Sequence, residues 1–324
     1  MDLSEIKKPI DKELDEFNSY FKDLMKTDVT LLTLVIRHLA KKKGKQIRPV
    51  LVFLSAGMIG NLNKRSHVGA AMVELLHTAT LVHDDVVDEA RVRRGITSIN
   101  AEWNNKVAVL VGDFLLSLGL QTSVDHDELK FLKVTSRAVQ KMSESELLAI
   151  DKSKDFGTTE EIYYKIIDGK TASLISSCCE IGAISASDDA DDHERLREFG
   201  TKLGIAFQLR DDLFDYTTKQ SIIGKPVGID IKEKKLTLPL LYSMHKADKA
   251  DVKRMTKIIK SKKIDKDGIN TVIEFVKEMG GVEYTYQKAE EFINEGKKLI
   301  EKYPDSEFKR SLINLADYIV ERKI

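Results

Sequence analysis

Cysteine and proline are both scarce in this sequence. Only two cysteines, Cys178 and Cys179, and five prolines occur among the 324 residues. Adjacent cysteines match no metal-ligand spacing and make a poor disulfide pair, so we expect two buried thiols in a reducing compartment. Average proline usage is about 5%, and its scarcity here leaves long stretches that can continue as helices.

Long hydrophobic runs and a net charge are also absent. No stretch of about eighteen apolar residues occurs, so the sequence predicts no segment that spans a bilayer. Residues 1–17 carry charges throughout and lack the apolar region of a signal peptide, which favours a cytoplasmic protein. Basic and acidic residues both number 52, so the net charge is zero and we expect no nucleic-acid partner.

Apolar residues recur at spacings of three and four along most of the chain, which is the period of an α-helix. No segment alternates with a period of two for long enough to predict a sheet. The length alone suggests about two domains, but no linker, repeat or low-complexity tract divides the chain, and we expect one helical domain over residues 1–324. The predicted helices cover residues 104–122, 126–150, 157–184, 188–217, 234–246, 283–302 and 309–323.

Two acidic clusters share the pattern Asp-Asp-x-x-Asp. Positions i and i+4 lie on one face of a helix with i+1 beside them, so each cluster gathers three carboxylates. Two unit charges about 4 Å apart repel by roughly 4 kcal/mol at an effective dielectric of about 20. Strongly apolar segments precede both clusters, which disfavours a solvated acidic face. The clusters are Asp84, Asp85 and Asp88, and Asp211, Asp212 and Asp215.

Divalent cations would offset the repulsion within these clusters. All-oxygen ligand sets suit Mg²⁺ or Mn²⁺ rather than zinc. Mg²⁺ typically takes one or two protein carboxylates and completes its octahedron with waters and phosphate oxygens. The sequence therefore predicts a site in which metal ions hold a phosphorylated substrate.

Basic residues close to both clusters could complete a diphosphate site. Arginine binds phosphate in a bidentate manner and lysine acts as a point charge. Each of these residues alone is more often a surface charge, and His77 alone is more often a core histidine. Their position beside the acidic clusters and beside glycine and proline favours an anion site. The candidates are Lys45, Arg48, His77, Arg93, Arg94, Lys170, Thr171, Lys225 and Lys235.

Several motifs follow one another in the order of a known family. They are GKQIRP at 44–49, ELLHTATLVHDDVVD at 74–88, RRG at 93–95, GDFLL at 112–116, KTASL at 170–174, FQLRDDLFD at 207–215 and GKPVGIDIKEKKLTLPL at 224–240. Together they resemble the trans-isoprenyl diphosphate synthase (polyprenyl synthetase) family over essentially the whole chain. The resemblance implies an all-α, isoprenoid synthase-type bundle of long helices around a deep central cavity, and a homodimer. Lys234 departs from the family pattern, which often has glycine there.

The resemblance also implies roles for individual residues. Three Mg²⁺ ions, with Mn²⁺ as a possible substitute, would be held by Asp84, Asp85, Asp88, Asp211 and, less strongly, Asp215. Asp212 would belong to the same catalytic group. The allylic diphosphate would contact Arg93, Lys170 and Lys225, with Lys235 close by. Isopentenyl diphosphate would contact Lys45, Arg48, His77 and Arg94. Gln208 and Thr171 would line the reacting end of the allylic substrate.

The implied reaction joins isopentenyl diphosphate to an allylic diphosphate, either farnesyl or geranylgeranyl diphosphate. Ala79 and Thr80 stand where related short-chain enzymes carry bulky aromatic residues, so we expect the cavity to continue past Leu76 and Val73. This pattern resembles the long-chain, octaprenyl diphosphate synthase-like branch, which makes side chains of respiratory quinones. The competing interpretation is that Ala79 and Thr80 are ordinary core residues.

Two alternatives stay open at this point. A short-chain synthase that makes farnesyl or geranylgeranyl diphosphate would use the same aspartate clusters. A non-catalytic partner subunit of a heteromeric synthase would share the fold, although such subunits typically lose the acidic clusters and this chain keeps both. In each case we expect membrane contact to be at most peripheral and to serve product release.

Overall fold

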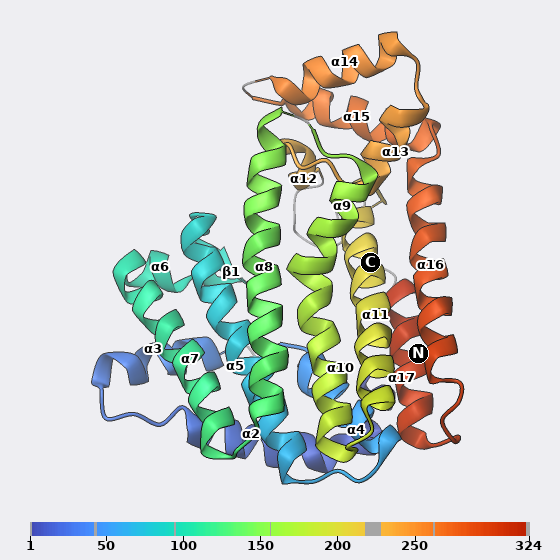
Figure 1. Cartoon of the computed structure of the whole chain (residues 1–324). Helices are drawn as coiled ribbons and strands as arrows, with labels where there is room; N and C mark the ends of the chain where they lie inside the picture. Colours follow the sequence, from blue (N-terminus) through green and yellow to red (C-terminus); the bar gives the residue numbers. More distant parts are fainter. Residues whose placement is uncertain are drawn as a thin grey trace.

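Long helices run side by side through most of the molecule (Figure 1). This computed structural model describes residues 2–41, 44–93, 95–155, 157–217, 228–261 and 263–321. The described residues are almost all helical, which confirms the all-α class that the sequence predicts.

The N-terminal part of the chain contains eight helices, a 3-10 turn and a hairpin within the described ranges. They are α1 (Leu3–Lys7), η1 (Lys8–Ile10), α2 (Asp11–Leu24), α3 (Thr30–Ala40), α4 (Ile47–Ile59), α5 (Lys64–Val87), β1 (Val92–Arg93), β2 (Ile96–Thr97), α6 (Ile99–Glu102), α7 (Asn105–Asp125) and α8 (Leu129–Asp155).

The rest of the described chain is helical. Its elements are α9 (Glu160–Ile167), a π-helical turn η2 (Asp168–Ala172), α10 (Ser173–Ala186), α11 (Ala190–Thr217), α12 (Ile229–Lys232), α13 (Leu238–Lys246), α14 (Lys249–Lys260), α15 (Lys266–Glu278), α16 (Gly281–Ile300) and α17 (Glu307–Glu321).

Each predicted helix corresponds to an observed one, with ends that shift by a few residues. The predicted helix 157–184 is interrupted by the π-helical turn η2 between α9 and α10. The loop 89–98 contains a small antiparallel hairpin in which Val92 pairs with Thr97 and Arg93 with Ile96. Strands of two residues are too short to show a period-two pattern, which explains why the sequence does not predict them.

The core of the bundle lies between α4, α5, α10 and α11. Helix α10 packs against both α4 and α11, α11 packs against α16, and α5 packs against α7. A second apolar cluster forms where Tyr216 of α11 meets α12 to α15, and α14 and α15 lie across one end of the bundle (top of Figure 1). The C-terminal ends of α5 and α11, which carry the acidic clusters, thus belong to well-packed helices.

Helix α5 illustrates why these segments are helical. The side chain of Asn63 accepts hydrogen bonds from the backbone N–H groups of Arg65 and Ser66, which caps the N-terminus. The helix is apolar on most of its surface, as expected for a helix that is surrounded by others. It ends at Val87, and Glu89 then adopts a left-handed conformation with φ 50°. The first acidic cluster therefore lies at the C-terminal end of a buried helix.

Glycine allows α11 to approach η2 closely. A Cβ atom on Gly204 would lie 2.5 Å from the Cα atom of Ala172, which is too close for any other residue. This contact brings Gln208, one helical turn further along α11, close to Thr171 in η2.

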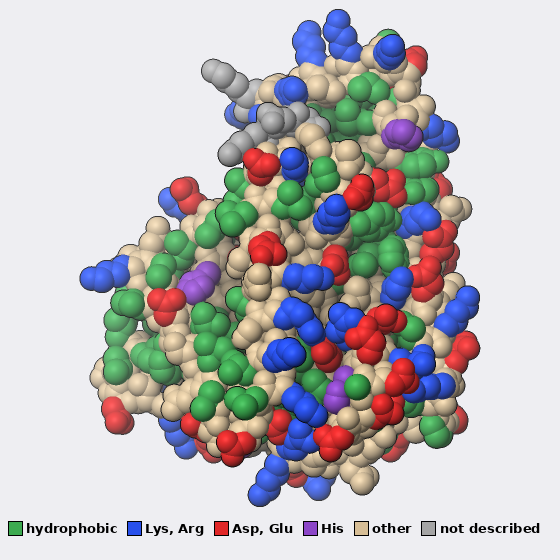
Figure 2. Space-filling view, in the orientation of Figure 1, with side chains coloured by type: hydrophobic (Ala, Val, Ile, Leu, Met, Phe, Trp, Pro, Cys, Tyr) green, Lys and Arg blue, Asp and Glu red, His purple; other side chains and the backbone are tan. Residues whose placement is uncertain are grey.

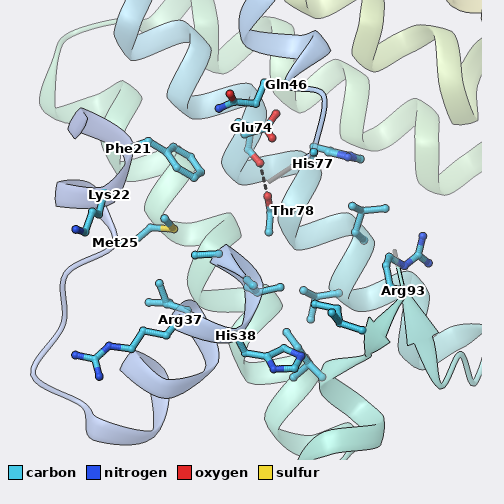
Figure 3. A pocket seen from close by; sticks show the side chains of 18 of the residues that line it. Phe21, Lys22, Met25, Arg37, His38, Gln46, Glu74, His77, Thr78 and Arg93 are labelled. Atoms are coloured by element: carbon cyan, nitrogen blue, oxygen red, sulfur yellow. Dashed lines mark hydrogen bonds between the residues drawn. The ribbon is translucent and has the colours of Figure 1, made fainter. Parts of the chain in front are cut away.

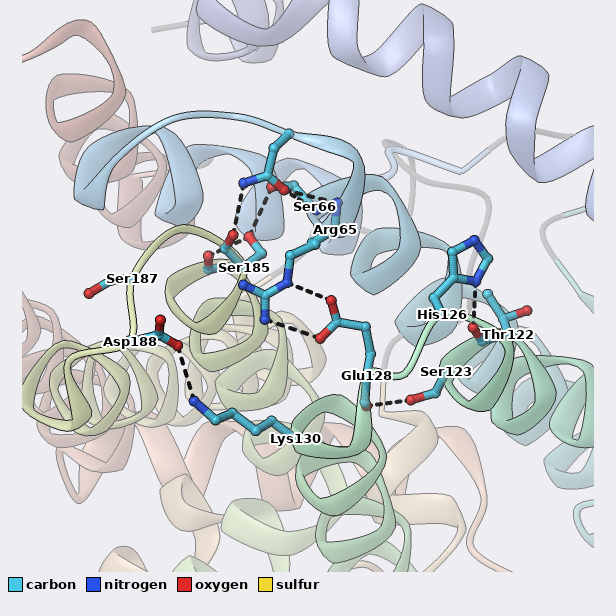
Figure 4. A network of polar contacts seen from close by, with 12 residues as sticks. Arg65, Ser66, Thr122, Ser123, His126, Glu128, Lys130, Ser185, Ser187 and Asp188 are labelled. Carbon is cyan, nitrogen blue, oxygen red and sulfur yellow. Dashed lines mark hydrogen bonds and ion pairs between the residues drawn. The ribbon is translucent and has the colours of Figure 1, made fainter.

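A polar network ties several helix ends together at the other end of α5 (Figure 4). Arg65 donates through Nε to Oε1 of Glu128 at 2.5 Å and through Nη2 to Oε2 at 3.1 Å. The Ser123 hydroxyl donates to the backbone carbonyl of Glu128, and the hydroxyls of Ser66 and Ser185 are 2.9 Å apart. These contacts join the start of α5, the turn between α7 and α8, and the end of α10.

Helix α7 is long and apolar enough to cross a membrane by length and composition alone. In this fold it packs along α5, as a core helix of a bundle also does. Its outward side exposes Val109, Leu110 and Val124, and apolar side chains gather over α3 and α7 in Figure 2. Elsewhere on that face, acidic and basic side chains are mixed.

Candidate active site

The hairpin folds back over the first acidic cluster. The Nε atom of Arg93 donates to Oδ1 of Asp85 at 2.6 Å, and the Asp85 side chain is almost fully buried. Asn100, in α6, donates to the backbone carbonyl of Asp85 at 2.9 Å. Arg93, which the resemblance assigns to the allylic diphosphate, is therefore paired with a predicted metal ligand.

Lys170, in the turn η2, lies close to Asp84 of the first acidic cluster. Burial raises the pKa of Asp84, Lys170 opposes this shift, and Glu146 and Asp88 add to it. The Nζ atom of Lys170 lies 2.5 Å from Oε2 of Glu146 on α8. Asp84, Glu146 and Asp88 together carry three negative charges against the two positive charges of Lys170 and Arg93, which leaves a surplus of negative charge at this end of α5.

The π-helical turn η2 positions Lys170 and Thr171. Single π-helical turns inside α-helices are rare and often occur at functional sites. The hydroxyl of Thr171 donates to Oε1 of Gln208 on α11 at 2.7 Å. The turn thus places Lys170 near the first acidic cluster and Thr171 near Gln208, which contacts the second.

The second acidic cluster is more deeply buried than the first. Asp212 is 4% exposed, and its two oxygens accept hydrogen bonds from the Tyr163 hydroxyl at 2.5 Å and from Nε2 of Gln208 at 2.7 Å. Burial raises the pKa of Asp212 to about 7, although both hydrogen bonds lower it. Both oxygens of Asp212 are therefore engaged with protein groups.

Asp215 faces the N-terminus of α12. Its Oδ2 accepts the backbone N–H of Asp230 at 2.5 Å. Burial raises the pKa of Asp215, whereas backbone hydrogen bonds from Asp230, Ile229 and Gly228 lower it. Burial also raises the pKa of Asp230 to about 6, and Asp215 adds to that shift. Asp230 thus adds a fourth carboxylate to the second cluster.

Lys235 links the two clusters. Burial lowers the pKa of Lys235, but an ion pair with Glu233 at 2.6 Å and the nearby charges of Asp230 and Asp88 raise it overall. Asp88 belongs to the first cluster and Asp230 lies beside the second. Lys235 therefore lies within electrostatic range of both clusters.

Two cavities open on either side of this region. A cavity of about 340 Å³ is lined by residues of both the basic and acidic sets, among them Lys170, Thr171, Gln208, Asp211 and Lys235. A second cavity of about 330 Å³ lies between α2, α3, α5 and the hairpin and includes His77, Glu74, Asp85 and Arg93 (Figure 3). Lys170 and Lys235 of the predicted allylic group thus line the first cavity, whereas Arg93 of that group and His77 of the predicted isopentenyl group line the second.

The other predicted isopentenyl diphosphate ligands are more dispersed. Lys45 is exposed and donates to the Tyr318 hydroxyl at 3.3 Å, next to α17. Arg48, at the start of α4, is partly buried. Its positive charge acts on the Cys178 thiol and opposes the rise in pKa that burial causes there. Arg94 and Lys225 lie outside the described residues.

The predicted chain-length residues are tightly packed. Leu76 and Val73 belong to the main core cluster, and Ala79 belongs to a separate cluster that includes Leu115 of α7. Thr80 is only partly buried, and its hydroxyl donates to the carbonyl of His77 at 2.9 Å. Their role in product length stays a prediction.

Three residues of the site have no place in the sequence-based set: Tyr163, Glu146 and Asp230. Tyr163 precedes Lys170 by two helical turns, and this spacing is a signal that could have identified it. Asp230 lies in an acidic and basic loop that the sequence singles out, GIDIKEKK. Glu146 is one of several acidic residues on an amphipathic helix, and its spacing carries no signal.

The donor set fits Mg²⁺ bound together with a diphosphate. Among the described residues, no three histidine, cysteine, aspartate or glutamate side chains converge closely enough to bind a metal ion by themselves. Mg²⁺ needs only one or two protein carboxylates when phosphate oxygens complete its shell. Asp84 and Asp211 offer oxygen ligands, and a bound cation would offset the burial that raises the pKa of Asp84.

Comparison with known proteins agrees with this geometry. Residues 29–276 match the family model described as Polyprenyl synthetase. The chain is 35% identical to an all-trans-nonaprenyl-diphosphate synthase (geranyl-diphosphate specific) of Rhodobacter capsulatus, over 97% of this chain and 96% of that one. It is 34% identical to the octaprenyl diphosphate synthase of Escherichia coli K12, over 99% of both chains.

Solved structures show the same similarity. A polyprenyl synthase from Caulobacter crescentus, complexed with calcium and isoprenyl diphosphate, superposes with a TM-score of 0.92 at 31% identity and covers 100% of this chain and 98% of that one. A decaprenyl diphosphate synthase from Rhodobacter capsulatus has a TM-score of 0.93 at 33% identity over 99% of both chains. The chain therefore belongs to the polyprenyl synthetase family, within the long-chain branch of the trans-isoprenyl diphosphate synthases. Enzymes of this family are generally dependent on divalent metal ions.

Proposed function

We propose that this protein condenses isopentenyl diphosphate with farnesyl or geranylgeranyl diphosphate and releases a long-chain all-trans polyprenyl diphosphate. The observation that carries the proposal is the position of Lys170, which acts on Asp84 of the first cluster and lines one cavity with Lys235 and Asp211 of the second. Carboxylates on two walls with lysines between them suit a diphosphate that is held by divalent cations. The long-chain relatives support the same reaction.

Three Mg²⁺ ions per site are part of the proposal. Asp84, Asp85 and Asp88 would hold two of them and Asp211 the third, with Asp215 in a lesser role. Bound Mg²⁺ supplies Lewis-acid stabilisation of the negative charge on the departing diphosphate. The engagement of Asp215 with the backbone of α12 supports a lesser role for this residue.

The residues of the chain bind and orient the two substrates. Lys170, Arg93 and Lys225 stabilise the charge that develops on the leaving diphosphate. Thr171 and Gln208 line the reacting end, where an allylic cation forms and the double bond of isopentenyl diphosphate attacks it. The released diphosphate then takes the proton. Water has to be excluded because it would quench the cation.

Isopentenyl diphosphate is proposed to bind beside the allylic diphosphate, where its double bond can reach the allylic cation. His77 lines the cavity between α2, α3 and α5, and Arg93 and Gln46 also line it. Lys45, Arg48 and Arg94 complete the proposed diphosphate contacts.

Assembly and location complete the proposal. We infer that the chain forms one domain over residues 1–324, acts as a cytoplasmic homodimer and makes at most peripheral membrane contact for product release. The exposed apolar residues Val109, Leu110 and Val124 of α7 support a surface that a second copy covers. A product used for quinone side chains would be consistent with the octaprenyl synthase relative.

The experiment that tests this function supplies purified protein with Mg²⁺, labelled isopentenyl diphosphate and a series of allylic primers. A ladder of products that ends well beyond twenty carbons is the expected result. Products that stop at fifteen or twenty carbons would replace the proposal by a short-chain synthase. No Mg²⁺-dependent product from any primer would indicate a non-catalytic subunit.

A further inference from the structure

A chain of three hydrogen bonds crosses the floor of the 340 Å³ cavity. It begins at the Tyr163 hydroxyl on α9, which donates to Oδ2 of Asp212 at 2.5 Å. It continues from Nε2 of Gln208 to Oδ1 of Asp212 at 2.7 Å. It ends with the Thr171 hydroxyl, which donates to Oε1 of Gln208 at 2.7 Å. All four side chains line the cavity.

The chemistry of Asp212 sets the direction of this chain. Both of its oxygens accept hydrogen bonds, one from the Tyr163 hydroxyl and one from Nε2 of Gln208. Gln208 therefore has to turn its NH₂ group toward Asp212 and its oxygen toward Thr171. The Thr171 hydrogen then points at Gln208, which leaves the lone pairs of the Thr171 oxygen free for other neighbours.

Burial keeps this series of hydrogen bonds from rearranging. Tyr163 and Asp212 are each 4% exposed, so water does not readily replace either partner. Tyr163 satisfies one oxygen of Asp212 and thereby leaves the other for Gln208. The Asp212 carboxylate has no oxygen that is free of a protein donor, unlike a carboxylate that is poised to bind a metal ion.

We propose that Asp212 is a positioning residue: with Tyr163 it fixes Gln208, and through Gln208 it makes Thr171 present its oxygen lone pairs to the reacting end of the allylic substrate. The negative end of the hydroxyl dipole then faces the developing allylic cation, where it stabilises charge. This inference rests on the proposed prenyl transfer and assigns Asp212 a role that differs from that of its neighbour Asp211.

The substitution Asp212→Asn should reverse the donor and acceptor roles of Gln208 and Thr171 in this series of hydrogen bonds. Tyr163 donates to the new amide oxygen, the new NH₂ group faces Gln208, and Gln208 flips to accept it. The Gln208 NH₂ group then donates to Thr171, whose hydrogen turns into the cavity and faces the cation. All four side chains stay hydrogen-bonded, so the fold should be retained. The positive end of the Thr171 hydroxyl dipole, however, now faces the allylic cation.

The test is a double-mutant cycle on kcat between Asp212→Asn and Thr171→Val, with the wild-type enzyme as reference. Asp212→Asn is expected to lower kcat by at least about tenfold, and by no more than the loss of about 10²–10³-fold that follows removal of one charge stabiliser. The KM for the allylic substrate should change by less than about twofold. The Thr171→Val variant has no hydroxyl that could be turned the wrong way. In this background Asp212→Asn should therefore lower kcat by no more than about twofold.

A charge exchange gives an independent readout. When Gln208→Glu is combined with Asp212→Asn, the introduced carboxylate can accept from both the introduced amide and the Thr171 hydroxyl. Thr171 therefore donates again, and kcat should recover at least half of the loss on a logarithmic scale. The Mg²⁺ concentration for half-maximal rate should stay unchanged in Asp212→Asn but rise in Asp211→Asn.

Three outcomes would overturn the inference: an equal loss of kcat in the Thr171→Val background, no recovery in the exchanged variant, or a raised Mg²⁺ requirement in Asp212→Asn. Each assumes an active wild-type enzyme. A wild-type protein without Mg²⁺-dependent prenyl transfer would instead remove the proposed function, so the two failures are distinguishable.

Discussion

The Nζ atom of Lys170 lies 2.5 Å from Oε2 of Glu146, so a lysine that is proposed to bind the leaving diphosphate is held by a carboxylate from α8. Both side chains are partly exposed, and the pair lies close to Asp84. A diphosphate that enters the site therefore competes with Glu146 for the same ammonium group. Glu146 keeps Lys170 directed at the site and at the same time opposes an anionic ligand.

Removal of this competition should tighten substrate binding. In Glu146→Gln the amide oxygen still accepts from Lys170, but the negative charge is gone. Partly exposed ion pairs are worth about 0.2–1 kcal/mol, so the KM for the allylic diphosphate should fall by about 1.4- to fivefold. Glu144→Gln is the matched control, because Glu144 lies on the same helix and accepts only from Gln140 among the contacts found for it. A raised KM in Glu146→Gln would show that the pair mainly orients Lys170.

The leading aspartates of the two clusters should be indispensable for the reaction but not for the fold. Asp84→Ala and Asp211→Ala should each lower kcat by at least about 10²-fold, since each removes a ligand for preorganised positive charge. Like-charge repulsion is relieved, so the thermal unfolding midpoint should stay the same or rise. Mg²⁺ with inorganic diphosphate should stabilise the wild-type protein against heat and stabilise both variants less. Turnover close to that of the wild type in either variant would refute the metal assignment.

The sequence predicts the parts of the site that come from continuous motifs. Asp84, Asp85 and Asp88 follow from the helical spacing, and the same holds for the second cluster. Long apolar periodic segments also predict most of the helices, because burial of one face sets their spacing.

Contacts between distant segments could not be predicted in the same way. Tyr163 and Asp212 meet only because α9 and α11 are packed side by side, and neither residue signals the other in the sequence. The same is true of Glu146, which reaches Lys170 from α8. The π-helical turn that contains Lys170 also could not be predicted, because it alters a single turn and does not change the spacing of apolar residues in the sequence.

The network at the far end of α5 should contribute to stability and not to catalysis. Glu128 is 7% exposed and forms a bidentate pair with Arg65, which is itself partly exposed (Figure 4). Glu128→Ala leaves Arg65 without this partner, and the free energy of unfolding should fall by about 1–3 kcal/mol. Lys130→Ala is the matched control, because it breaks an exposed pair with Asp188 that is worth about 0–1 kcal/mol. Equal effects in chemical denaturation would show that the buried position of Glu128 is unimportant.

The buried thiols should be unreactive in the native protein. Burial raises the pKa of Cys179 to about 12, and it also raises the pKa of Cys178. Only the thiolate reacts, and both thiols stay protonated at any pH well below these raised values. A thiol-specific reagent at pH 8 should label neither cysteine in the folded protein and both after denaturation. Rapid labelling of native protein would indicate local opening of α10.

Product length should depend on the side chains that precede the first cluster on α5. Ala79→Phe adds an aromatic group next to Leu75 and Leu115 in a packed cluster, so a loss of roughly 1–3 kcal/mol in stability is expected from overpacking. Thr80→Phe is the better-tolerated companion, because Thr80 is only partly buried and lies one turn before Asp84. Both variants should shift the products toward shorter chains while the Mg²⁺ requirement stays the same. An unchanged product distribution in two folded variants would mean that the growing chain leaves the site along another path, for example past α2 and α3, where the cavity that contains His77 is lined by Phe21 and Met25.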